Sequence, residues 1–200
     1  MRFFKENSYS IVKLFVNQIG ISIFSLMLYT AVTVANLDFD VTKLIKFMIS
    51  IFSILFYAFL LYTISWEIGA KDRLHVDSGK EKKRPWKGAV LSLLANLPNF
   101  LFASVCLILI LLYLSTGGEG FLSASGIVNL IFRLLASMYL GTVTFFFDLS
   151  ASGGAPDYLI LVRQSILFLV LPLISILATH IGYRMGLAQL RLFKDPKAKK

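Results

Sequence analysis

The stretch Ala89–Ser115, AVLSLLANLPNFLFASVCLILILLYLS, decides the fold because it contains no charged residue over its whole length. A helix needs about 20 apolar residues to cross the hydrocarbon core of a bilayer, and this stretch exceeds that length. Four further long, mainly apolar stretches share this character: Ile11–Ala35, Leu44–Trp66, Ile127–Phe147 and Leu159–Tyr183. The sequence therefore predicts an all-α, polytopic transmembrane helix bundle with four to six membrane segments.

The overall composition agrees with a membrane protein. Hydrophobic residues make up 57% of the 200 residues, charged residues make up 16%, and the mean hydropathy is +0.76. Soluble domains carry about 25% charged residues. The apolar stretches and their short connections use nearly all of the chain, so we expect a single integral membrane domain over residues 1–200, with no room for a soluble catalytic domain.

The positive charge is concentrated in a loop over residues 67–87 and a tail over residues 184–200. A net charge of +9 is compatible with nucleic-acid binding, but these basic residues border apolar stretches. The lipid bilayer, with its anionic cytoplasmic leaflet, is therefore the expected partner, and nucleic acid is not. The positive-inside rule places both basic segments in the cytoplasm. We expect an integral protein of the bacterial cytoplasmic membrane with cytoplasmic N- and C-termini.

This charge distribution conflicts with five simple crossings. The connections Ser115–Gly126 and Asp148–Asp157 contain no Lys or Arg, which favours an external position. Five crossings would place the basic tail outside. Four crossings plus a re-entrant Phe121–Phe147 would place every basic segment inside, whereas two spans within Phe121–Phe147 would each be too short. We favour the re-entrant arrangement, and five ordinary crossings remain the alternative because the charge rule is a bias.

The fourth apolar stretch carries a polar stripe. Its small or polar residues recur at four-residue intervals, which places them on one side of a helix: Ser125, Asn129, Arg133, Ser137 and Gly141. Such a stripe faces other protein or a water-filled cavity. It is either a structural, hydrogen-bonded contact between helices or a site where Arg133 binds an anionic group or a carboxylate. The candidate carboxylates on the external side are Asp38, Asp40, Glu119, Asp148 and Asp157.

A second polar group surrounds a proline in the third apolar stretch. Asn96 and Asn99 flank Pro98, which removes a backbone donor and kinks a helix. The amides either satisfy the freed backbone or line a polar cavity, as broken membrane helices often do. Pro172 predicts a second kink at a comparable depth. The candidate ligand-binding residues are therefore Asn129, Arg133, Ser137, Asn96 and Asn99.

The remaining motifs predict no catalytic or metal chemistry. His75 and His180 are the two histidines of the chain, and neither has a second ligand one helical turn away, so we expect no metal and no cofactor. The 67–87 loop is either a solvated hairpin that sets orientation or a docking surface for a membrane-protein or cytoplasmic partner.

These features favour a transport component, either a permease subunit or a membrane substrate-binding subunit with a polar site around Arg133. The alternative is a non-transport scaffold or assembly factor that binds another membrane protein or lipid. A membrane-embedded enzyme acting on lipid is disfavoured because no acid–base or nucleophile pair can be named, and we expect no enzymatic activity.

Overall fold

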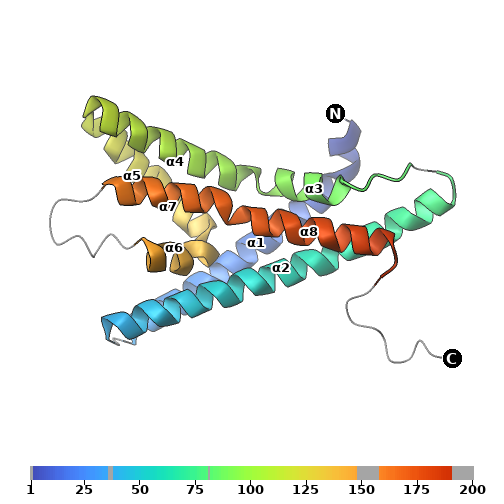
Figure 1. The fold of residues 1–200 in the computed structure, drawn as a ribbon, viewed down its shortest axis with the longest axis horizontal. Helices are drawn as coiled ribbons and strands as arrows, with labels where there is room; N and C mark the ends of the chain where they lie inside the picture. The colour runs from blue at the N-terminus through green and yellow to red at the C-terminus, as the bar shows by residue number, and fades with distance from the viewer. Residues whose placement is uncertain (1, 36–37, 81, 148–157, 191–200) are drawn as a thin grey trace.

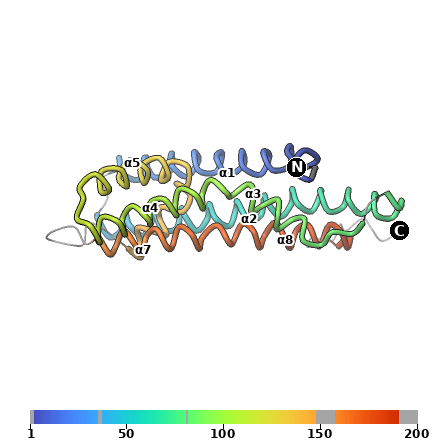
Figure 2. Tube along the Cα trace, turned by 90° about the horizontal axis from the view of Figure 1, so that it is seen from above, coloured from blue at the N-terminus to red at the C-terminus, as the bar shows by residue number. Residues whose placement is uncertain are grey.

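The computed structural model describes residues 2–35, 38–80, 82–147 and 158–190, and every regular element in them is helical. The helices are α1 (Arg2–Val34), α2 (Phe39–Asp77), α3 (Lys87–Ala95), α4 (Leu97–Thr116), α5 (Glu119–Leu135), the short 3₁₀ helix η1 (Ser137–Tyr139), α6 (Leu140–Phe146), α7 (Tyr158–Val170) and α8 (Pro172–Leu187). The predicted all-α fold is confirmed. The bundle is flat, with α1 and α5 on one face and α7 and α8 on the other (Figure 2).

Within the described residues, four helical parts are long and apolar enough to cross a membrane: α1, α2, α4 and the continuous pair α7–α8. The bent pair of α5 with η1 and α6 makes a fifth if it counts as one span. Their outward side chains include large apolar groups such as Leu55 and Leu101, whereas Ser25 and Ser53 hydrogen-bond to each other inside the bundle. Lipid accepts such an apolar surface, and interhelical polar contacts are typical of membrane bundles. The structure is that of a membrane-spanning helical protein.

The two ends of the bundle differ in which connections they hold. The start of α1, the end of α2, the start of α3 and the end of α8 lie together (Figure 1); we call this the basic end. The other end, called the opposite end, holds the end of α1, the start of α2, the α4–α5 turn, the end of α6 and the start of α7.

The segment formed by α5, η1 and α6 is broken rather than straight. Its two helical parts meet at an angle of 88°, next to Ala136. The start of α5 and the end of α6 both lie at the opposite end (Figure 1). The segment thus enters and leaves at one end, as expected for a re-entrant Phe121–Phe147, and the start of α1 and the end of α8 share the basic end.

The predicted loop over residues 67–87 is wrong in its first half, because α2 continues to Asp77. Its 39 residues span about 58 Å at 1.5 Å per residue, so α2 projects well beyond a hydrocarbon core of about 30 Å. Packing against α8 stabilises this projecting C-terminal part of α2. A Cβ on Gly69 would collide with the backbone of Tyr183, and a Cβ on Gly186 with that of Trp66.

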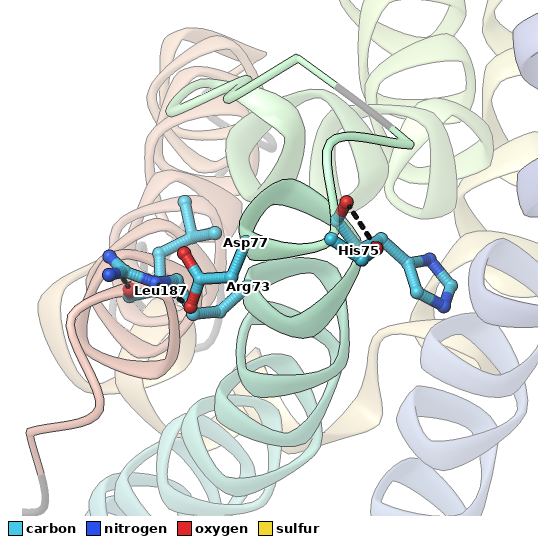
Figure 3. A network of polar contacts seen from close by, with 5 residues as sticks. Arg73, His75, Asp77 and Leu187 are labelled. Carbon is cyan, nitrogen blue, oxygen red and sulfur yellow. Dashed lines mark hydrogen bonds and ion pairs between the residues drawn. The ribbon is translucent and has the colours of Figure 1, made fainter.

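Polar contacts continue the α2–α8 interface at the basic end. The Tyr183 hydroxyl donates to Asp72 over 2.7 Å, and Lys87 Nζ lies 2.8 Å from the same carboxylate. Arg73 Nε pairs with Asp77 at 2.8 Å, and its Nη1 donates to the Leu187 carbonyl at 3.4 Å (Figure 3). His75 points away from this pair (Figure 3). Contacts with α8 therefore stabilise α2 beyond Trp66. These tertiary contacts could not be predicted from the sequence.

The helix interruptions predicted at prolines are present. Asn96 separates α3 from α4, two residues before Pro98, and Leu171 separates α7 from α8, immediately before Pro172. The pair α7–α8 still forms one span of 30 residues.

Candidate functional site

Arg133 lies half-buried in the last turn of α5 and bonds to two amide oxygens. Its Nε donates to Asn129 Oδ1 at 3.0 Å, one turn earlier on the same helix. Its Nη2 donates to Gln164 Oε1 of α7 at 2.7 Å. A guanidinium at this depth is costly unless it is hydrogen-bonded, and both acceptors here are uncharged.

Gln164 is a site residue that the sequence analysis missed. Its side chain is buried, and its Nε2 donates to the carbonyl of Phe147 at the end of α6 over 2.6 Å. Because the amide nitrogen is used there, the amide oxygen faces Arg133. Gln164 thus joins α5, α6 and α7. Its signal in the sequence was a polar amide inside an otherwise apolar stretch, but nothing there identified its partner.

A pocket of about 390 Å³ opens beside Arg133. Its polar lining brings together three cations and three hydroxyl groups: Arg133, Lys43, Lys46, Tyr29, Thr42 and Thr144. Leu26, Phe39 and Leu140 supply apolar walls. A pocket of this size is in the range that holds small ligands, which is about 300–1,000 Å³. The two lysines were also missed; their three-residue spacing at the start of a span was the available signal.

The expected carboxylate partner of Arg133 is not found among the described residues. Asp38, Asp40 and Glu119 make no ion pair or hydrogen bond with Arg133. Asp148 and Asp157 lie outside the described residues. Within the described part of the chain, neutral amides take the place that the sequence analysis assigned to a carboxylate.

The prediction of one continuous stripe from Ser125 to Gly141 is wrong, because α5 ends at Leu135. Ser137 lies in η1 and donates its hydroxyl hydrogen to the carbonyl of Ser22 in α1. Ser22 in turn donates to the Leu135 carbonyl at 2.7 Å. Ser137 is therefore part of a contact that fixes the helix break to α1 and is separate from the Arg133 contacts.

Gly141 serves close packing at the same break. Its N–H donates to the Tyr29 hydroxyl oxygen at 2.7 Å, and a Cβ at this position would collide with the backbone carbonyl of Lys46. This close approach places α6 directly against α1 and α2, beside the pocket.

Asn96 and Asn99 lie in a different polar cluster, fully buried where α3 and α4 meet. Gln18 Nε2 donates to Asn99 Oδ1 at 2.8 Å, and Asn99 Nδ2 donates to Asn96 Oδ1 at 3.0 Å. Asn96 Nδ2 then donates to Ser175 Oγ of α8 at 3.0 Å. This chain of amides links α1, α4 and α8, so the structure does not bring Asn96 and Asn99 together with Arg133.

No protein-family model, curated protein or solved structure matches this chain. Among the described residues, no group of three or more His, Cys, Asp or Glu side chains is arranged to hold a metal ion. The Arg133 pocket and the arrangement of the helices around it are therefore the features that bear on function.

Proposed function

We propose that this small polytopic membrane protein is a transport component, either a permease subunit or a membrane substrate-binding subunit. The observation that carries the proposal is the half-buried Arg133, held by neutral amides beside a pocket and next to the break of the bent segment formed by α5, η1 and α6. Broken helices that line a cavity commonly form binding sites in transporters. The Lys and Arg content of the basic end favours a cytoplasmic position for that end, so we expect the pocket to open toward the external side.

A non-transport scaffold is the second candidate. The glycine contacts between α2 and α8 and the Gln18–Asn99–Asn96 chain favour it, since both make a rigid bundle without requiring a ligand. A partner on the exposed bases Lys82 and Lys83, in the connection between α2 and α3, fits either function. We propose no enzymatic activity, because the described lining of the pocket has no carboxylate, histidine or cysteine.

Accessibility of the pocket from both sides of the membrane tests transport against scaffolding. Thr144 lines the pocket and is half-buried, so Thr144→Cys in a Cys106→Ser background reports on access. A membrane-impermeant thiol reagent is applied to right-side-out and to inside-out vesicles. Transport requires labelling from outside and, in a fraction of molecules, from inside, because the site must alternate between the two faces.

Two exposed positions serve as matched controls for this labelling. Ser115→Cys at the opposite end and Ser78→Cys at the basic end should each react from one side of the membrane only. Labelling of Thr144→Cys from the external side alone, with both controls behaving normally, would argue against transport and favour a fixed binding or scaffolding role.

A further inference from the structure

The polar side chains that line the pocket are donors with a strong excess of positive charge. Lys43 and Lys46 extend from the first turns of α2, Arg133 extends from α5, and no lining residue in the described part of the chain is acidic. Lys43 Nζ lies 5.7 Å from the centroid of the Phe145 ring, a cation–π distance that keeps the ammonium near α6. Thr42 and Thr144 also line the pocket, although the Thr144 hydroxyl already donates to the Leu140 carbonyl at 2.8 Å. This lining suits an anion with several acceptor oxygens.

Arg133 is not saturated by its own neighbours. A guanidinium has five N–H donors. One Nε hydrogen and one Nη2 hydrogen are used by Asn129 and Gln164, so three donors have no partner among the described residues. Both partners are neutral and leave the charge uncompensated within the described structure. A half-buried arginine of this kind gains most from a bidentate oxyanion, which matches its planar fork.

The contacts around Arg133 hold it in place before a ligand arrives. Gln164 is fixed by the Phe147 carbonyl, and Asn129 holds Nε from within α5. Tyr29 accepts from the Gly141 N–H and so ties α6 to α1 at the pocket wall. A preorganised site loses little side-chain entropy on binding, which raises affinity.

We propose that the Arg133 pocket binds a phosphate group, presented either by free phosphate or by the headgroup of an anionic lipid. Three cations match a doubly charged oxyanion better than a single carboxylate. The apolar walls formed by Leu26, Phe39 and Leu140 leave room for the hydrocarbon part of a lipid. The inference concerns the same site as the proposed transport function and names its ligand class.

Binding is tested with the full chain in phosphatidylcholine nanodiscs by isothermal titration with inorganic phosphate, against sodium chloride and sodium acetate at equal ionic strength. A second preparation contains phosphatidic acid in the nanodisc, and its retention through purification is measured by mass spectrometry. Titration with inorganic phosphate identifies a free ligand, and selective retention of phosphatidic acid identifies a lipid. Absence of both, or equal binding of acetate, overturns the proposal.

Variants assign any binding to the pocket. Gln164→Glu keeps the size and shape of the side chain but places a carboxylate on Arg133, which neutralises the site; we expect at least a tenfold loss of phosphate affinity or of lipid retention. Arg133→Leu should have the same effect. Arg163→Leu is the matched control, since this exposed arginine is adjacent to Gln164 and lies outside the pocket lining. It should retain affinity within about twofold.

An unchanged affinity in Gln164→Glu and Arg133→Leu, with both proteins folded, would overturn the assignment. The labelling and binding experiments test the proposed transport function and the proposed ligand class independently. Two-sided labelling of Thr144→Cys without phosphate binding would keep transport and remove the ligand class. Phosphate binding with one-sided labelling would keep the ligand and replace transport by a fixed binding role.

Discussion

Among the described residues, Arg133 illustrates how a charge inside an apolar helix is held by neutral amides. Two amide oxygens orient the guanidinium and leave its charge available to the pocket. A carboxylate partner would have neutralised the group and reduced its attraction for an anion. The neutral partners are therefore consistent with a binding residue, and they explain why the shape of the guanidinium should matter as well as its charge.

Arg133→Lys tests the importance of that shape. An ammonium retains the charge but cannot reproduce the planar, bidentate fork, so it cannot hold Asn129, Gln164 and a ligand together. We expect phosphate affinity, or retention of phosphatidic acid, to fall by about three- to tenfold, between the wild-type protein and Arg133→Leu. Titration of the three proteins side by side measures this order, and a lysine variant as weak as the leucine variant would contradict it.

Asn99 is the central member of the buried amide chain, and its loss should affect stability. Asn99→Leu leaves Gln18 Nε2 and Asn96 Oδ1 without their partners in a fully buried position. Each unsatisfied buried group costs about 1–3 kcal/mol. Because two groups lose their partners, we expect the free energy of unfolding in detergent to fall by about 2–6 kcal/mol. Asn17→Leu is the control, since Asn17 makes one local bond to the Lys13 carbonyl and should change stability by less than about 0.5 kcal/mol.

Sequence reasoning identified Arg133 and Asn129 because a four-residue spacing predicts contact along one helix. It did not identify Gln164, Lys43 or Lys46 as members of the site, because their relation to Arg133 depends on where the tertiary fold places α5 relative to α2 and α7. Asn96 and Asn99 were recognised as buried polar residues, but their partners Gln18 and Ser175 come from other helices. A four-residue spacing in the sequence predicts contacts within one helix. Contacts between helices follow no regular spacing, so the sequence does not reveal them.

The same limit applies to whole helices. The apolar stretches and their lengths indicated the spans, and the prolines indicated two of the three interruptions. The break next to Ala136 had no proline or glycine to mark it; Ser137 is bonded to α1 there, and Gly141 packs against α2. The extension of α2 to Asp77 likewise depends on glycine contacts and on the Asp72–Tyr183 bond with α8. Both features arise from neighbours rather than from local composition.

The close packing of α2 and α8 predicts that replacing one glycine, Gly182, lowers the stability of the protein. A Cβ on Gly182 would collide with the backbone of Tyr62, which cannot move independently of α2. Gly182→Ala should therefore destabilise the bundle by about 1–3 kcal/mol, as forced overpacking does. Gly20→Ala in α1 is the matched control, since nothing lies near its Cβ position. Thermal unfolding in detergent compares the two, and equal stability would show that α2 and α8 can separate at little cost.

The arrangement of the whole chain separates charge between its two ends. Lys43 and Lys46 lie in the first turns of α2, and Arg163 lies in α7; both of these helices start at the opposite end (Figure 1). Lys71, Arg73, Lys87 and Arg184 lie where α2 ends, α3 starts and α8 ends, at the basic end. With four crossings and one re-entrant segment, residues 78–86 and the tail after Leu187 are expected on one side. Single cysteines at Ser78 and Ala198, in a Cys106→Ser background, should react with an impermeant reagent from the same face. Reaction from opposite faces would establish five full crossings.

The connection between α2 and α3 should control this orientation. Lys80, Lys82, Lys83 and Arg84 are exposed, and the ion pairs near them among the described residues, Arg73–Asp77 and Lys87–Asp72, do not include them. They are therefore free to act through the positive-inside bias. Neutralising all four to Gln should lower membrane abundance or produce molecules labelled at Ser78→Cys from the wrong face. Matched neutralisation of Lys43 and Lys46, at the other end of α2, removes charge from the opposite end and should leave orientation intact. Normal abundance and orientation of the fourfold variant, together with loss of a co-purifying protein, would instead make this connection a docking site.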